Sequence, residues 1–289
     1  MTRIALVLAF ASVLPPAALA QGEPTTHAPS VPSNWYVENL TWPEVRDAVA
    51  AGRASAIIYT GSTEQNGPHM ALGKHNFVAH YVAGRIAQAL GDALAYPTLP
   101  FAPTGDPVAK TGHMRFPGSV SVSPEVYLGV VRQVALSAIA AGFKQVFLMG
   151  DHGGGQGELA CAAEGLDQDW HARGVRVFYV PDLYFKEKER MRGYLREHNI
   201  PEDRHAGTDD TSEIMYLDAA AQWIRRDKLA ASDSTQESTT GVDGDPTRAT
   251  TGIGRMFIEH KLQNAVDQIR QLRTRKPAPA LRGLTTACS

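Results

Sequence analysis

Hydrophobic positions along this chain form short continuous runs that alternate with longer stripes of helical spacing. A continuous run of about four to eight apolar residues is typical of a buried strand, and a stripe at every third or fourth position is typical of a helix. The runs predict strands over residues 54–59, 93–99, 143–149 and 175–180, and the stripes predict helices over 77–90, 126–141, 158–172, 214–220 and 255–273. This alternation indicates a parallel sheet covered by helices on both faces.

Single residues mark the expected starts of several of these helices. Asn76 is expected to cap the helix over 77–90, because an asparagine side chain can accept from a free backbone N–H of the first turn. Pro124 fits the start of the next helix, where a missing N–H costs nothing. Asp210 or Thr211 could cap the helix that follows them, an interpretation that is compatible with a role in the site.

Residues 1–20 have the pattern of a secretory signal peptide. Arg3 supplies a positive charge, an apolar run covers 4–14, and a small-x-small cleavage site ends at Ala20. The run is too short for an uncleaved anchor, since spanning a bilayer takes about twenty apolar residues. We therefore expect a periplasmic or secreted protein with no stable membrane insertion after cleavage.

The rest of the chain divides into a flexible mature N-terminus over 21–34 and a single α/β domain over 35–289. The polar segment 231–251 predicts a long loop, and such loops in compact domains are usually functional or disordered. Cys161 lies in an apolar helical stretch and Cys288 lies near the C-terminus, so we expect no structural disulfide between the only two cysteines.

Composition and charge argue against a nucleic-acid partner. Hydrophobic residues make up 43% of the chain and charged residues 20%, which is ordinary for a globular protein. The formal net charge is −2, and lysine and arginine are spread along the chain. A polyanion-binding face would need these cations to cluster.

Polar, glycine-rich segments follow two of the predicted strands, at residues 61–75 and 150–157. Ligands bind outside the carboxyl ends of parallel strands, so these segments are expected to carry the chemistry. The first segment contains a carboxylate, an amide and two histidines: Glu64, Asn66, His69 and His75. Each could instead cap a turn or face solvent, but the cluster favours a site for zinc, manganese or iron.

The second segment places His152 directly after a buried strand, beside Asp151 and ahead of the glycines at 153–155. Glycines without side chains would let a metal approach this histidine. A glycine-rich turn between a strand and a helix can also bind phosphate. The segment matches neither G-x-G-x-x-G nor G-x-x-x-x-G-K-[ST], which disfavours a nucleotide.

Two further polar segments contain histidines. His205 precedes Asp210 just before a predicted helix, and His113 lies in the loop 111–119, which we interpret as a wall on the substrate side. No G-x-S-x-G motif is present, so a serine nucleophile is disfavoured. The H-E-x-x-H and C-x-x-C patterns are missing as well, which excludes the usual zincin and zinc-ribbon signatures.

Five ordered segments resemble motifs of the creatininase (creatinine amidohydrolase) family. The first follows the spacing of G-x-x-E-Q-H-G-P-H-L-P-L-x-x-D, and the others match F-P-G-T/S, N-G-H-G-G-N, H-A-G-x-x-E-T-S and G-V-x-G-D-P. They lie at residues 61–75, 116–119, 150–155, 205–212 and 241–246. The resemblance spans roughly residues 40–260, and its third match is loose. Five motifs in order are much harder to match by chance than one.

The resemblance implies an α/β fold, a three-layer sandwich with a mostly parallel central sheet. It also implies a divalent-metal site and hydrolysis of amide-type C–N bonds other than ordinary peptide bonds, in small cyclic or linear substrates. A homo-oligomer is the implied assembly. Family members include deformylases and peptide-processing enzymes, so the substrate itself does not carry over.

Three positions depart from the family's metal-binding pattern. Asn66 stands where the family usually has a metal-binding histidine, His75 where it has a bridging aspartate, and Gly154 where some members have a glutamate. Glu64, His75 and His152 then remain as a ligand set for one divalent ion, which we expect to be zinc, with manganese or iron as alternatives. Without the bridging carboxylate, a second ion is not expected.

The remaining polar residues of these segments receive supporting roles. His205 and Asp210 are expected to move protons, and Asn66 and His69 to orient water or a ligand. Residues beside the ligands or against the substrate are expected to be His113, Ser119, Asp151 and Asp245. The altered ligand positions favour one alternative, a catalytically silent metal- or ligand-binding protein on the same fold. Metal content and an amide-hydrolysis screen would separate the two.

Export predicts a defined mature N-terminus. Cleavage after Ala20 should leave Gln21 as the first residue of protein recovered from the periplasm or medium. N-terminal sequencing checks this. Protein that retains Met1 in the cytoplasm would contradict it.

Overall fold

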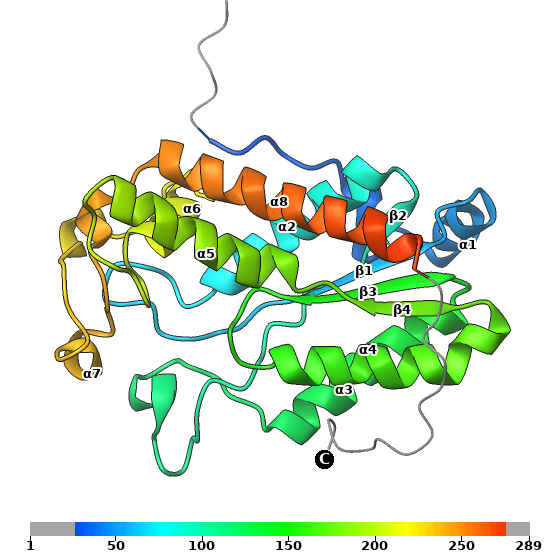
Figure 1. Cartoon of the computed structure of the whole chain (residues 1–289), viewed down its shortest axis with the longest axis horizontal. Helices are drawn as coiled ribbons and strands as arrows, with labels where there is room; N and C mark the ends of the chain where they lie inside the picture. Colours follow the sequence, from blue (N-terminus) through cyan, green and yellow to red (C-terminus); the bar gives the residue numbers. More distant parts are fainter. Residues whose placement is uncertain (1–26, 276–289) are drawn as a thin grey trace, which may run out of the picture.

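The computed structural model describes residues 27–275. The predicted signal peptide and residues 21–26 of the 21–34 segment lie outside the described residues, as does Cys288. Four parallel strands form one sheet in the order β2-β1-β3-β4 (Figure 1). They are β1 (Ser55–Thr60), β2 (Ala93–Ala95), β3 (Gln145–Gly150) and β4 (Arg176–Tyr179). All four predicted strands are confirmed, with β2 shorter than expected.

Helices cover both faces of the sheet (Figure 1), which confirms the predicted three-layer α/β sandwich. One layer contains α2 (Lys74–Leu90), α5 (Asp182–Glu197), α6 (Thr208–Leu217) and α8 (Thr251–Arg273). The other contains α3 (Pro124–Ala140) and α4 (Gln156–Trp170), with α1 (Trp42–Ala50) near the sheet edge. Short elements complete the chain: α7 (Glu237–Thr240) and the 3-10 turns η1 (Ser33–Trp35), η2 (Val37–Asn39), η3 (Gly112–Arg115), η4 (His171–Arg173), η5 (Arg226–Lys228) and η6 (Pro246–Arg248).

The central strands are buried on both faces. In β1, Ile57 and Tyr59 pack into the core beneath α2, α6 and α8, whereas Ala56 and Ile58 pack into the core on the α3 and α4 side. Each of these four side chains is fully buried. This two-sided burial explains why β1 reads as a continuous apolar run and not as an alternating one.

The strand order creates a switch point between β1 and β3. From β1 the chain crosses through α2 to β2 on one side, and later enters β3 on the other side of β1. Connections therefore leave the carboxyl ends of β1 and β3 in opposite directions and open a crevice between them. The two glycine-rich segments singled out in the sequence begin at this crevice.

Two predicted helix caps are wrong. Helix α2 begins at Lys74 after Gly73, so Asn76 lies inside its first turn, where its side-chain amide donates to the Thr63 hydroxyl at 3.1 Å. Helix α6 begins at Thr208, so neither Asp210 nor Thr211 caps it. In both cases the first turn carries polar residues that bond to neighbouring loops, and this tertiary bonding leaves no apolar stripe to reveal the true start.

Other differences concern segments with weak local signals. The sequence left α1 and α5 unassigned; α5 has a largely charged sequence with few apolar positions. The 231–251 segment is organised by backbone bonds, from Ser232 to Gly244 and from Asp243 to His205. Cys161 is disulfide-bonded, so the expectation of no bridge is wrong. Its side chain is 8% exposed, at the edge of the core, where a cross-link can reach it.

Among the described residues, no helix combines the length and apolar character that a membrane span requires.

The packing of α8 against α6 depends on Gly254, and this predicts a stability effect. A Cβ at Gly254 would collide with the backbone of Ser212. We expect Gly254→Ala to lower the free energy of unfolding by about 1–3 kcal/mol, because rigid backbone must move. The matched control is Gly252→Ala in the same helix, where the nearest atom is 3.9 Å away.

Gly252→Ala should be neutral or should raise the free energy of unfolding by up to about 1 kcal/mol, through helix propensity. Urea denaturation of both variants provides the measurement. Equal stabilities for the two alanine variants would contradict the close α6–α8 contact.

Candidate functional site

A cavity of about 200 Å³ lies at the carboxyl ends of β1 and β3. Its lining comes from the β1–α2 segment, the turn after β3, the inner face of α5, the residues around the start of α6, and α8. The three predicted metal ligands, the two predicted proton-transfer residues and two of the predicted supporting residues face it. They are Glu64, His75 and His152; His205 and Asp210; and His113 and Asp151. These residues meet at the switch point, the place where the sequence predicts the site.

The three predicted metal ligands converge inside this cavity. Nε2 of His75 lies 3.0 Å from Oε1 of Glu64, and Nε2 of His152 lies 2.8 Å from Oε2 of the same carboxylate. The donor atoms of the three residues lie within 4.8 Å of one another. The Glu64 and His75 side chains are 1% and 9% exposed, and that of His152 is 11% exposed.

Hydrogen bonds on the far side of the imidazoles bear on which nitrogen can bind a metal. Nδ1 of His75 lies 2.7 Å from the Asp151 carboxylate, which can only accept, so Nδ1 carries a proton. Nε2 of His75 faces the Glu64 carboxylate at 3.0 Å, where it carries a proton when no metal is bound and would give that proton up to bind one. Nδ1 of His152 accepts from the Gly154 backbone N–H at 3.0 Å and also lies 3.2 Å from the Gly154 carbonyl oxygen, so its neighbours are compatible with either tautomer. A carboxylate that orients a ligating histidine is a common feature of metal sites. The three side chains therefore fit a divalent ion.

Asp151 joins this group to the core. Its carboxylate accepts from the Tyr59 hydroxyl at 2.9 Å and from the Lys261 ammonium at 2.8 Å, in addition to His75. Burial disfavours its charged form, but Lys261 and His75 outweigh burial and hold the pKa of Asp151 well below its usual range. Asp151 is thus a fixed negative charge behind His75.

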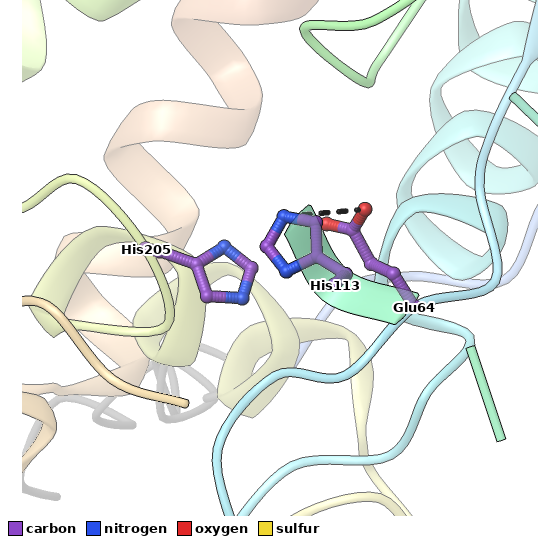
Figure 2. A group of neighbouring side chains, drawn as sticks. All are labelled: Glu64, His113 and His205. Carbon is purple, nitrogen blue, oxygen red and sulfur yellow. Dashed lines mark ion pairs between the residues drawn. The ribbon is translucent and has the colours of Figure 1, made fainter. Parts of the chain in front are cut away.

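A second group of donors shares Glu64. Figure 2 shows Glu64 beside His113 and His205, with a dashed line for the 3.8 Å contact between Nε2 of His113 and Oε2 of Glu64. The two imidazole rings lie 4.4 Å apart between centroids. Donor atoms from these three residues also lie within 4.8 Å of one another, so distance alone would allow a metal here too.

The hydrogen bonds of Gln65 argue against that second metal position. Its Oε1 accepts from the Gly67 backbone N–H at 2.9 Å, which fixes the amide, so its Nε2 donates to Nδ1 of His113 at 3.0 Å. The proton of neutral His113 is therefore on Nε2, which faces Glu64 as a donor and cannot bind a metal. Gln65 also accepts from Nε2 of His205 through its carbonyl oxygen at 2.9 Å, leaving Nδ1 of His205 as an acceptor.

Burial sets the charge of these residues. Desolvation by burial lowers the pKa of His205 to about 3, helped by the nearby Lys74, and burial also lowers the pKa of His113. Both rings are therefore neutral near pH 7. Burial alone would raise the pKa of Glu64, but His75 and His152 hold it well below its usual value. Glu64 is consequently ionised, as a metal ligand must be.

Asp210 lies in the cavity wall as half of a buried ion pair. Its Oδ2 lies 2.8 Å from the Lys74 ammonium and accepts from the Ala206 backbone N–H at 2.8 Å. Despite burial, Lys74 and Lys188 hold the pKa of Asp210 well below its usual range. The bond to Ala206 supports a residue with φ of 54°, a conformation unusual for a side chain other than glycine. Asp210 therefore fixes the turn that presents His205.

Four other predicted site residues lie outside the cavity lining. Asn66 donates from its amide to the Glu64 carbonyl oxygen at 2.9 Å, and Ser119 accepts from the Gln65 backbone N–H at 2.9 Å. Both bonds shape the loop that carries Glu64. Nε2 of His69 bonds to the Thr211 hydroxyl at 2.9 Å. The Asp245 carboxylate accepts from the Thr247 backbone N–H at 3.0 Å and thereby caps the start of η6.

Sequence reasoning missed several residues of the cavity. Lys74 lies within the first recognised motif, and its position beside His75 was an available signal. Gln65 of the same motif lies outside the cavity lining but bonds to His113 and His205, and its place beside Glu64 was a signal of the same kind. The others have no motif: they come from α5, which was unassigned, and from α6 and α8, where they face inward by helical spacing. These are Leu183, Tyr184, Glu187, Lys188, Met191, Glu213 and Lys261.

Comparisons with known proteins agree with this architecture. A family model described as creatinine amidohydrolase (Creatininase) matches residues 38–269. The chain is 25% identical over 235 residues to the mycofactocin precursor peptide peptidase of Mycolicibacterium smegmatis, covering 74% of this chain and 84% of that protein. It is 29% identical over 190 residues to the creatinine amidohydrolase of Pseudomonas putida, covering 63% of this chain and 71% of that protein.

Solved creatininases share the fold. A structure described as Creatininase Mn aligns with a TM-score of 0.67 and 21% identity, covering 83% of this chain and 99% of the other. A mutant creatininase of Zn–Zn type aligns with a TM-score of 0.68 and 20% identity, covering 83% and 98%. At these identities the likeness establishes the three-layer fold.

The burial of His69 predicts a pH effect on stability. Burial is the main cause that lowers its pKa from 6.5 to about 4, with Asp210 opposing and Lys74 adding to the shift. Between these values the unfolded chain binds a proton that the folded chain does not, so stability falls as the pH drops through this window. The slope due to His69 approaches about 1.4 kcal/mol per pH unit.

His69→Gln should remove this contribution while keeping a polar partner for the Thr211 hydroxyl. The measurement is urea denaturation of chelator-treated wild type and variant between pH 7 and pH 4.5. The difference in unfolding free energy should shift in favour of the variant as the pH falls. Parallel curves would show that His69 does not titrate as its burial requires.

Proposed function

The chain belongs to the creatininase family, and we propose that it hydrolyses an amide-type C–N bond in a small cyclic or linear substrate with the help of a bound divalent ion. The observation that carries this proposal is the convergence of Glu64, His75 and His152 on one wall of a cavity. The bond from His75 to Asp151 adds support, because it holds the ring so that Nε2 points toward Glu64, where a metal could take the place of its proton.

We propose one ion per chain, zinc by preference, with manganese or iron as alternatives. Glu64, His75 and His152 would hold it, a two-histidine, one-carboxylate set that leaves positions open for water. Gly154 offers no side-chain ligand, and the amide of Asn66 is used by the Glu64 and Ala71 carbonyl oxygens. The proton on Nε2 of His113 argues against a second ion, in contrast to the Zn–Zn creatininase.

When bound, the ion would lower the pKa of a water molecule from about 16 toward about 7 and polarise the scissile carbonyl. The protein's own groups then handle protons. Nδ1 of His205 is the free acceptor in the cavity, and Nε2–H of His113 is a donor that can reach a substrate oxygen. Such acid–base groups contribute about 10²–10⁴-fold in rate. Asp210, paired with Lys74, positions His205 through the Ala206 turn.

A catalytically silent metal-binding protein is the second candidate. It is favoured by the three ligand positions at which this chain departs from the family, Asn66, His75 and Gly154. Elemental analysis of the purified protein and a screen of amides and lactams separate the two candidates. One bound ion with hydrolysis of any amide supports the enzyme, whereas one bound ion without hydrolysis supports the silent protein.

The role of His75 predicts a pattern across four variants. His75→Ala and His152→Ala should each lose metal and activity together, because each removes one of three ligands. Asn66→Ala should lower metal affinity or activity by about 10–100-fold, as expected for a residue that positions a ligand without binding the metal itself. His75→Asp should change metal preference or stoichiometry, because it supplies the carboxylate that the family uses to bridge two ions.

The measurements are metal content by elemental analysis and the rate on one amide that the wild type hydrolyses. Full metal and full rate in His75→Ala would show that the ligand set is wrong. Two tightly held ions in the wild type would show that another acid supplies the missing bridge.

A further inference from the structure

The wall of the cavity formed by α5 contains a lysine without an ionic partner. The side chains that face the cavity recur one helical turn apart along α5, and Tyr184 and Lys188 are two of them. The Lys188 ammonium lies 5.7 Å from the centre of the Tyr184 ring. Within residues 27–275, no carboxylate lies within 4.0 Å of this ammonium, and the Tyr184 hydroxyl has no hydrogen-bond partner.

The other two lysines of the cavity are already paired. Lys74 lies 2.8 Å from Asp210, and Lys261 lies 2.8 Å from Asp151 and 3.2 Å from Glu213. Within each pair, the positive and negative charges balance at close range. They leave Lys188 as a cation that the cavity does not balance at close range.

The other acidic residues near Lys188 are either largely uncharged or hydrogen-bonded to other groups. Burial raises the pKa of Glu187 to about 8, and its Oε2 accepts from the Asn264 amide, so near pH 7 it is largely uncharged. Burial also raises the pKa of Asp209, whose Oδ1 accepts from the Asp210 backbone N–H. Asp209 and Asp210 act on Lys188 only from beyond 4.0 Å, but they outweigh burial and keep it protonated.

The α5 wall also lies close to the metal-binding turn. A Cβ added to Gly153, the residue after His152, would lie only 2.7 Å from the Tyr184 hydroxyl. The phenol and the ammonium therefore stand in the same small cavity as Glu64, His75 and His152. Two adjacent donors without acceptors match the two oxygens of a carboxylate, and a charge-assisted bond to the ammonium would be the stronger of the two.

We propose that the substrates of this site carry a free carboxylate, which Lys188 and Tyr184 bind on the α5 wall while the amide lies at Glu64, His75 and His152. This inference rests on the proposed amide hydrolysis and specifies the substrate class as amido acids. In a cavity of about 200 Å³, both groups must belong to one compact molecule. Lys188 and Tyr184 would then determine specificity, whereas the acid–base and metal-binding groups stay unchanged.

The test compares amides that differ only in the carboxylate. Full-length protein loaded with zinc is given N-acetyl ω-amino acids, from N-acetylglycine to 5-acetamidopentanoate, and the N-alkylacetamides of matching length. Binding is measured by calorimetry and hydrolysis by release of the amine. The best carboxylate member should bind about 10–100-fold more tightly than its neutral counterpart, the range expected for hydrogen bonds to charged groups.

Three variants assign that preference to Lys188. Lys188→Met should weaken binding of the carboxylate amides far more than binding of their neutral counterparts, and Lys188→Arg should retain part of the preference for the carboxylate. The matched control is Lys186→Met, an exposed lysine of the same helix, which should keep the full preference.

Equal binding of carboxylate and neutral amides by the wild type would overturn the proposal, even if both were hydrolysed. A loss of both classes alike in Lys188→Met would also overturn it, since Lys188 would then be a structural residue. Preferential carboxylate binding without any hydrolysis would support the carboxylate site and contradict the proposed amide hydrolysis instead.

Discussion

The site depends on one buried carboxylate, that of Asp151, at the carboxyl end of β3. It accepts hydrogen bonds from Tyr59 of β1, His75 of α2 and Lys261 of α8, and so joins the sheet to one helical layer. A buried charge is tolerated only when it is paired and hydrogen-bonded, and here all three partners are needed. The same bonds fix the tautomer of His75, so the packing of the core and the chemistry of the site are set by one interaction.

Hydrogen bonding selects between two groups of donors that distance alone leaves equivalent. Both groups contain Glu64 and two imidazoles. His75 donates from Nδ1 to Asp151 and can give up the proton on Nε2 to a metal, whereas His113 receives a bond from Gln65 and keeps its proton on the nitrogen that faces Glu64. One group is therefore suited to hold a cation, and the other offers a neutral donor and, at His205, a neutral acceptor. The α5 wall completes the cavity with the Lys188 ammonium, which has no carboxylate within 4.0 Å among the described residues.

The strands and the place of the site were predictable because they depend on local patterns. Apolar runs with β-branched and aromatic residues revealed β1 and β3, and motif spacing brought Glu64, His75 and His152 together. The caps of α2 and α6 were missed because their first turns bond to distant loops. The role of Lys188 could not be read from the sequence, since α5 is largely charged and whether a lysine lies near a carboxylate is a property of tertiary packing.

The central claim concerns where a metal binds, and anomalous diffraction from metal-loaded crystals tests it most directly. The account predicts one peak per chain, at about 2.0–2.2 Å from a Glu64 oxygen and from Nε2 of both His75 and His152. Nδ1 of His75 should remain bonded to Asp151. A peak between Glu64, His113 and His205, or two peaks sharing Glu64, would contradict the assignment of tautomers on which the account depends.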